Sequence, residues 1–265
     1  MLTRTRTIIT CTAAAAAAGL AASIAAPAPA TARLAPSIVA GPYGAPRPAS
    51  NNQAIGVSAA PASNRYFAGY QAPVPAGSAT VATATFTVPA LSCTVTTFPR
   101  AIGPVAGVDE NNFKTYSSAF LFTGCVNGQA VNYPALVVNG TFTPYPATLF
   151  AAGDVIDLTT KVSTNRTRVQ VTDVTTGVTQ KILGPGARAD DGYFGDSPWF
   201  TGTGTLLHVP GFGKLQFKNC LVDGKALASW RPRAYQRVNS NGTVQISTGG
   251  FWPGGTAFTT RYMHS

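Results

Sequence analysis

A strict two-residue alternation of side chains near position 85 restricts the fold of this chain more than any other feature of its sequence. Thr83, Thr85 and Thr87 alternate there with alanine, phenylalanine and valine. Successive side chains of a β-strand point to opposite faces of a sheet, so this spacing places hydroxyl groups on one face and apolar groups on the other. Residues 81–88 are therefore predicted to form a strand with one buried and one solvent-facing side.

Two later parts of the chain show the same alternation in pairs of segments. Residues 168–172 and 178–183 flank a Thr-Thr-Gly sequence and predict a β-hairpin. Residues 235–238 and 243–247 flank Asn241-Gly242, a pair in which both residues tolerate positive φ, and predict a second hairpin.

The rest of the chain continues the pattern of short strands between turn residues. Further strands are predicted at 103–108, 117–123, 134–142, 154–162, 213–219 and 256–262. Outside the N-terminal segment, no stretch of about 12 residues has the apolar spacing of a helix. The sequence thus predicts an all-β fold of antiparallel strands, as a two-sheet β-sandwich or a closed barrel.

The N-terminus has the features of a secretory signal peptide. Arg4 and Arg6 precede an apolar run that ends in the small residues Ala30-Thr31-Ala32. We expect cleavage after Ala32 and a secreted protein, rather than a spanning helix or a lipid anchor, and no stable insertion into a membrane. Residues 33–63 are rich in proline and alanine and predict a linker or pro-segment. The folded domain is expected at 64–265.

The chain is basic, but its basic residues are scattered. The net charge is +10, and loss of Arg4 and Arg6 with the signal peptide leaves +8. The basic residues of the exported part cluster no more densely than in pairs such as Arg231 and Arg233, so no stripe typical of nucleic-acid binding is present. An anionic cell-wall polymer is a partner that this charge favours, and we expect a monomer that binds no nucleic acid.

Three cysteines remain in the predicted exported protein, namely Cys93, Cys125 and Cys220. An odd number in an oxidising compartment predicts one disulfide and one remaining thiol, and the sequence leaves open which two pair. His208 and His264 stand in no recognisable catalytic context, so a cysteine nucleophile is not expected.

Several segments match one known family in their order and spacing. They are Asn64–Tyr70, Ala84–Pro89, Gly107–Asp109, Phe120–Gly124, Ala152–Ile156, Val209–Asn219 and Phe258–Tyr262. Over residues 64–262 the chain resembles the eqolisin-type glutamic peptidases, which are secreted acid endopeptidases with a β-sandwich of the legume-lectin (concanavalin-like) kind. The resemblance implies that fold, and it implies no cofactor.

The catalytic positions of that family are substituted in this chain. Its peptidases use a glutamate to activate a water molecule and a glutamine to stabilise the oxyanion. The glutamine of Ile-Leu-Gln-Thr-Gly falls on Phe122, and the glutamate before a tryptophan falls on Pro198, which precedes Trp199. Neither Phe122 nor Pro198 has a side chain that carries a proton or donates a hydrogen bond.

The substitutions favour a pseudo-peptidase that binds an extended peptide, a glycan or a cell-wall polymer in the groove of its sheet without cleaving it. The alternative is an active acid endopeptidase that uses displaced groups such as Asp109, Gln129 or Glu110, which is the single glutamate of the chain. A structural domain of the cell wall without a defined ligand is a third reading. Candidate groove residues are Phe122, Leu136, Val138, Pro198, Trp199, Asp109 and Trp252.

A metal site is not expected. Asp190, Asp191 and Asp196 lie close together in what is predicted to be a solvated loop, but their spacing matches no calcium-binding motif. Aromatic residues at 193–200 and 251–252 predict core packing, with Trp252 at a loop tip as a stacking surface for a ligand.

Overall fold

The computed structural model of the protein describes residues 60–77, 80–94, 99–110, 115–200 and 206–264. The elements are β1 (Ala62–Asn64), β2 (Ala68–Pro73), β3 (Thr80–Thr87), β4 (Arg100–Glu110), β5 (Thr115–Val126), β6 (Gln129–Val138), β7 (Thr141–Pro144), β8 (Val155–Val162), β9 (Thr167–Asp173), β10 (Thr179–Gly184), β11 (Asp191–Ser197), β12 (Lys214–Val222), β13 (Lys225–Ala226), the 3-10 helix η1 (Leu227–Trp230), β14 (Arg233–Val238), β15 (Val244–Thr248) and β16 (Phe258–Tyr262). Within the described ranges no helix is long and apolar enough to cross a membrane.

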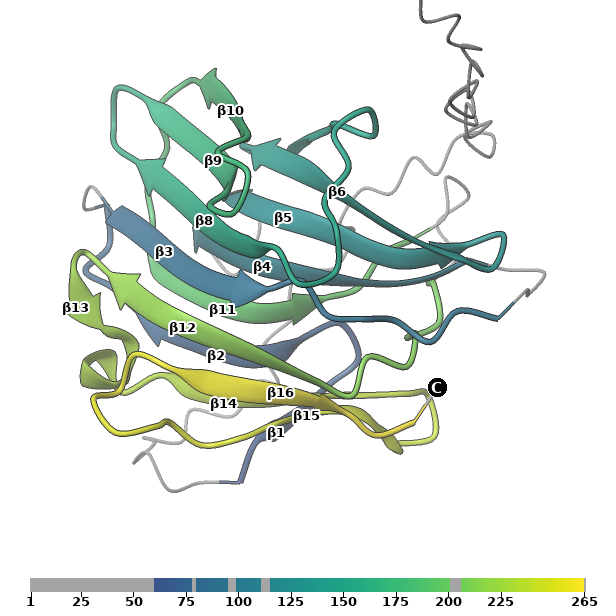
Figure 1. The fold of residues 1–265 in the computed structure, drawn as a ribbon. Coiled ribbons are helices and arrows are strands. Elements are labelled where there is room, and N and C mark those ends of the chain that lie inside the picture. Colours follow the sequence, from purple (N-terminus) through teal and green to yellow (C-terminus); the bar gives the residue numbers. More distant parts are fainter. Residues whose placement is uncertain (1–59, 78–79, 95–98, 111–114, 201–205, 265) are drawn as a thin grey trace, which may run out of the picture. The chain divides into compact units, whose positions relative to one another are not determined.

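The strands form two packed layers, which confirms the predicted β-sandwich (Figure 1). The front sheet has the order β10-β9-β8-β3-β12-β16, and the back sheet has the order β14-β2-β11-β4-β5-β6-β7. Strand β15 pairs with both β16 and β14 and so joins the layers along one side. All these pairings are antiparallel, whereas the short β1 runs parallel to β14.

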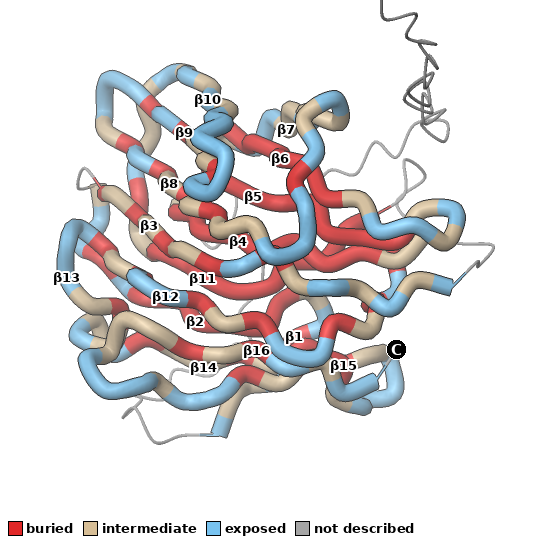
Figure 2. Tube along the Cα trace, in the orientation of Figure 1, coloured by how far each residue is buried: buried red, intermediate tan, exposed pale blue. Residues whose placement is uncertain are grey.

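The alternation that predicted β3 is present in the structure. Ala82, Ala84 and Phe86 are buried between the sheets, while Thr83 and Thr85 on the other face are half-buried (Figure 2). The rings of Phe86, Phe217 and Phe258 pack together in this interior. Burying one such side chain contributes about 1.5–3 kcal/mol, so the core is the main stabilising feature of the sandwich.

Two predictions about turns were wrong in detail. The segment 134–142 is not one strand, because Asn139 and Gly140 have φ of 50° and 78° and turn the chain from β6 into β7. The hairpin at Asn241-Gly242 is confirmed, but only Gly242 has a positive φ there. The side chain of Asn239 accepts hydrogen bonds from the backbone N–H groups of Asn241 and Thr243, which makes the turn longer than predicted.

Strand β11 was missed, and the predicted loop was wrong for Asp191 and Asp196, whereas Asp190 lies in a bend before the strand. The strand lies between β2 and β4 and is buried on both faces, so its sequence has no alternation. Its glycines, which are typical of loops, have a steric role instead. A Cβ on Gly195 would lie 2.1 Å from the backbone oxygen of Ala68, and the φ of +152° also favours glycine.

The cysteines follow the predicted division into one disulfide and one thiol. Cys93 and Cys125 are bonded, with their Cα atoms 5.4 Å apart, and Cys220 is a buried free thiol. The predicted signal peptide lies outside the described residues. Most of the predicted linker does so too, although its last residues Ala62 and Ser63 pair with β14 as part of β1.

Candidate functional site

The outer face of the back sheet, which points away from the front sheet, is covered by aromatic side chains. We call this surface the aromatic face, and it consists of Phe67, Phe120, Phe122, Tyr133, Tyr193, Trp199 and Tyr235. Each of these side chains is at most 6% exposed. Alternation puts them there, because the even positions of β5 and the odd positions of β6 and β11 point to the same side.

Phe122, at the position matched to the family's glutamine, lies in the middle of this apolar cluster. Its ring stacks on Tyr133 with the centroids 4.6 Å apart and meets Trp199 edge-on at 4.9 Å. Phe122 itself is fully buried. The side chain at this position is thus hydrocarbon among other rings and donates no hydrogen bond.

The register identifies the residue that faces Phe122 across the sheet. Thr123 pairs with Ile102 and Phe120 with Val105, so Phe122 lies opposite Gly103 of β4. Gly103 in turn pairs with Ser197 of β11. Ser197 is therefore the partner in this row, one residue before the position that sequence matching on Trp199 assigned.

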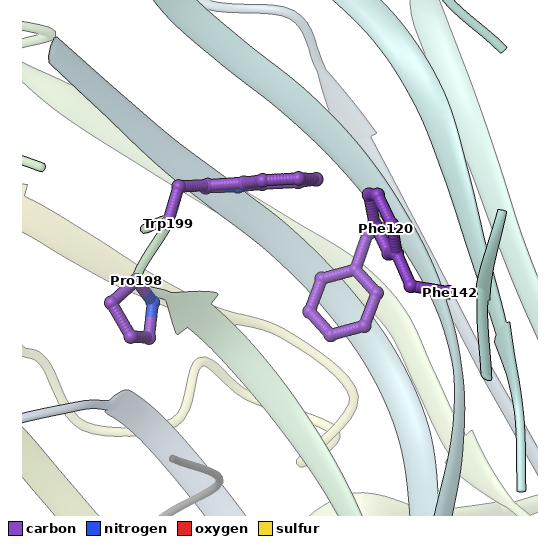
Figure 3. Close-up of a pocket in the computed structure, with 4 residues that line it drawn as sticks. All are labelled: Phe120, Phe142, Pro198 and Trp199. Atoms are coloured by element: carbon purple, nitrogen blue, oxygen red, sulfur yellow. The ribbon is translucent and has the colours of Figure 1, made fainter. Parts of the chain in front are cut away.

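Pro198 lies just beyond β11 and lines a shallow depression. Pro198 and Trp199 form one side of it, and Phe120 and Phe142 form the other (Figure 3). Neither Ser197 nor Pro198 carries a carboxylate, so neither side chain supplies an ionisable group beside Phe122.

Two glycines of β4 allow the aromatic side chains to lie flat on the sheet. A Cβ on Gly103 would lie 2.4 Å from Nε1 of Trp199, and a Cβ on Gly107 would lie 2.4 Å from the ring of Tyr193. Any larger residue at these positions would displace a ring, because real Cβ contacts are never that short. The glycines of β4 are thus part of the aromatic face, although the sequence offered no sign of that role.

The other end of the same face is polar. Asp109 of β4 is directly opposite Asp191 of β11. Burial raises the pKa of Asp191 to about 7, and the charge of Asp190 adds to this, while a hydrogen bond from Gln71 acts in the opposite direction. The side-chain oxygen of Gln71 also accepts a hydrogen bond from the hydroxyl of Tyr235 at 3.2 Å. We call Asp109, Asp191 and Gln71 the carboxyl–amide end.

The carboxyl–amide end was not found from the sequence. Asp191 was placed in a loop, and Gln71 belongs to β2, a strand that was not predicted. Six residues of β4 separate Asp109 from Gly103, which corresponds to about 20 Å along the strand. This end is therefore a separate site from the row of Phe122.

The displaced groups that were predicted do not converge. Glu110 pairs with Thr115 at one end of β5, and Gln129 pairs with Val126 at its other end. Eleven residues of an extended strand span about 36 Å, so Glu110 and Gln129 cannot act on one substrate bond.

The other predicted groove residues are spread over the molecule. Phe122, Pro198 and Trp199 lie together, and Asp109 lies on the same face at its far end. Leu136 and Val138 point to the opposite side of β6, into the interior between the sheets. Trp252 is 50% exposed in the segment between β15 and β16, while its neighbour Phe251 packs on Tyr70.

Asp196 points away from the other two aspartates of its group. It accepts a hydrogen bond from Thr260, and Arg237 is the charged group that acts on it. The guanidinium of Arg237 donates a hydrogen bond to the backbone oxygen of Leu207 at 3.3 Å. The backbone N–H of Leu207 donates a hydrogen bond to the backbone oxygen of Trp199 at 2.7 Å. The described residues contain no group of three or more His, Cys, Asp or Glu side chains that could hold a metal ion.

Solved structures with a similar fold are glutamic peptidases. Scytalido-glutamic peptidase, solved with a transition-state-analogue inhibitor, matches with a TM-score of 0.61 at 15% identity over 75% of this chain and 98% of the other. SCP-B, described as a member of the eqolisin family and solved with the tripeptide Ala-Ile-His, matches with a TM-score of 0.58 at 15% identity over the same shares. The aspergilloglutamic peptidase of Aspergillus niger matches with a TM-score of 0.52 at 16% identity over 62% of this chain and 99% of the other. No protein-family model and no curated protein matches this chain.

Proposed function

We propose that this protein is a secreted pseudo-peptidase that keeps the glutamic-peptidase fold and binds an extracellular peptide or glycan on its aromatic face without cleaving it. The observation that carries the proposal is the packing of Phe122 between Tyr133 and Trp199. Hydrolysis requires a base, a water molecule and a hydrogen-bond donor at the scissile carbonyl. In the row of Phe122, Gly103 and Ser197 only a serine hydroxyl is polar.

The depression beside Trp199 supports a small contact with a ligand. It has no room for a water-sized molecule in this structure, so the contact is with its rim and not within an enclosed pocket. It is lined by Phe120, Phe142, Pro198 and Trp199, whose apolar groups would meet one side chain or one sugar ring lying over it. A peptide ligand is further supported by the tripeptide bound to SCP-B.

Export of the protein is supported by the Cys93–Cys125 bond, because disulfides persist mainly in oxidising compartments. It agrees with the predicted signal peptide at 1–32.

A protease assay between pH 2 and 8 on a denatured protein substrate tests the absence of catalysis. The protein without residues 1–32 should show no cleavage. Two double variants, Phe122→Gln with Ser197→Glu and Phe122→Gln with Pro198→Glu, test which position of a glutamate restores proteolytic activity. The proposal would be refuted if the unmodified protein cleaved the substrate and this activity co-purified with the protein through every step.

A binding assay tests the ligand site. Quenching of the protein's tryptophan fluorescence, to which Trp199 contributes, is followed while short peptides and oligosaccharides are added. Phe142→Ala should weaken binding, because Phe142 contributes to the lining of the depression. Trp252→Ala is the control, since Trp252 lies in the segment between β15 and β16 and does not line it. An effect of Trp252→Ala as large as that of Phe142→Ala would place the ligand elsewhere.

An acid hydrolase centred on the carboxyl–amide end is the second candidate. Asp191 has a pKa raised to about 7 and accepts a hydrogen bond from the amide of Gln71, so an acid and a donor do meet on this face. If the assay detects hydrolysis, Asp191→Asn should abolish it, and Asp223→Asn, an exposed carboxylate on another turn, should not. Activity that survives Asp191→Asn would exclude this candidate.

A further inference from the structure

The outer face of the front sheet, on the side of the sandwich opposite the aromatic face, carries an excess of positive charge. Its outward positions bear six exposed basic side chains, Lys161, Arg168, Lys181, Lys214, Lys218 and Arg261. The carboxylate at an outward position of these strands is Asp157, and its Oδ1 accepts a hydrogen bond from Thr85 at 2.6 Å. In Figure 1 these strands lie in front of β4, β5 and β11.

The register places like charges directly opposite each other at two points. Lys161 of β8 pairs with Arg168 of β9, and Lys214 of β12 pairs with Arg261 of β16. Like charges directly opposite in a sheet are destabilising. Within the described parts of the chain, none of these four cations forms an ion pair that would relieve the repulsion.

Lys181 adds a third cation beside the first pair. It lies opposite Gln170, the next outward residue after Arg168. Diagonal neighbours of this kind are about 7–8 Å apart, so Lys161, Arg168 and Lys181 form one compact group on β8, β9 and β10. A guanidinium and two ammonium groups at that spacing suit the oxygens of phosphate groups.

Hydroxyl and amide groups cover the surface between the cations. The outward positions include Thr83, Thr85, Thr159, Thr172, Thr179, Gln170 and Thr259. Gln170 links Arg168 to Thr172, and Thr172 contacts Thr179 at 3.1 Å. No aromatic side chain occupies an outward position of the described strands of this face, so it offers no platform for stacking the bases of a nucleic acid.

The two groups of cations lie on opposite sides of the sheet face. Four strand-to-strand steps separate β9 from β16, which corresponds to about 19 Å. A single small anion cannot bridge that distance, whereas a chain with repeated charges contacts both groups and the hydroxyl groups between them.

We propose that this face binds a linear polyanion that carries phosphate groups, lying across the strands from β10 to β16. The bound phosphates would separate the like charges of Lys161 and Arg168 and of Lys214 and Arg261. The proposal is independent of the proposed function, because the two surfaces lie on opposite sides of the sandwich.

Long-chain inorganic polyphosphate is the probe in the test, with affinity measured by titration calorimetry and stability by thermal unfolding. The face variant is Lys161→Gln, Arg168→Gln and Lys181→Gln combined. The control variant is Arg65→Gln, Lys225→Gln and Arg231→Gln, which removes the same charge from exposed positions off this face. Far-UV circular dichroism verifies that both variants are folded.

The expected result is specific to the face. Polyphosphate should raise the unfolding temperature of the unmodified protein, and the face variant should bind about tenfold or more weakly, while the control variant changes by less than about twofold. Equal losses in both variants would show that only net charge matters and would overturn the proposal. Binding to duplex DNA or to vesicles of phosphatidylglycerol that is tighter than binding to polyphosphate would overturn the choice of partner. Vesicle binding would be favoured by the exposed Leu183, which lies opposite Arg168.

Discussion

The burial of the Asp196 carboxyl group predicts that the stability of the protein depends strongly on pH. The side chain of Asp196 is fully buried, and one oxygen accepts a hydrogen bond from Thr260, while the other has no partner among the described residues. Burial raises its pKa from 3.8 to about 7, although the charge of Arg237 acts in the opposite direction. Arg237 has a pKa lowered by burial to about 10 and therefore remains charged below pH 8.

The sign of the effect follows from which state binds the proton more tightly. The folded protein holds the proton of Asp196 up to about pH 7, while the unfolded chain releases it near 3.8. The contribution to stability is therefore complete below pH 3.8 and is lost as the pH rises to about 7. At 1.36 kcal/mol for each pH unit, the loss amounts to about 4 kcal/mol.

Urea unfolding at pH 4, 6 and 8 of the unmodified protein and of Asp196→Asn measures this contribution. The free energy of unfolding of the unmodified protein should fall by about 4 kcal/mol more between pH 4 and 8 than that of the variant. Asp223→Asn, at an exposed carboxylate, is the control and should keep the full pH dependence. If Asp196→Asn shows the same fall as the unmodified protein, Asp196 is ionised in the folded state and the reasoning is refuted.

Three further predictions concern stability and the aromatic face. Replacing Cys93 and Cys125 by serine opens a link between residues 32 apart and should lower the free energy of unfolding by about 4 kcal/mol; a loss below about 1 kcal/mol in denaturant titration would contradict this. Phe122→Ala empties a fully buried site and should cost about 3–5 kcal/mol by the same measurement, and an unchanged stability would mean that the cluster is not packed as described. Gly107→Ala should cost about 1–3 kcal/mol and alter the near-UV circular dichroism, because the new methyl group meets the ring of Tyr193; an unaltered spectrum would argue against that contact.

The strands that could be predicted from alternation are those with one wet face, whereas β4 and β5, which are buried on both faces, were predicted as short segments bounded by turn residues. β3, β8 and β9 alternate between buried and more exposed residues, and their sequences showed it. β11 lies in the middle of the back sheet and is buried on both faces, so its sequence gave no period to detect. Its glycines and aspartates are also typical of loops, which is why Asp191 and Asp196 were assigned to one.

The candidate site was predictable only at the positions where residues are matched one by one. Phe122 and Trp199 were identified in this way and do lie together. Ser197, Gln71 and the pairing of Asp109 with Asp191 depend on which strands are neighbours and in which register. No local pattern carries that information, because the paired residues are far apart in the chain.

The amino-acid sequence alone determined the class of fold and the number of thiols left for a disulfide, and it predicted the loss of a glutamine and a glutamate at the positions matched to a glutamic peptidase. Tertiary structure decided that Phe122 stacks among aromatic rings and that two aspartates meet beside an amide at the other end of the same face. The reason is physical. Alternation assigns each side chain to a face from local sequence, but only the packing of distant strands decides which side chains share that face as neighbours.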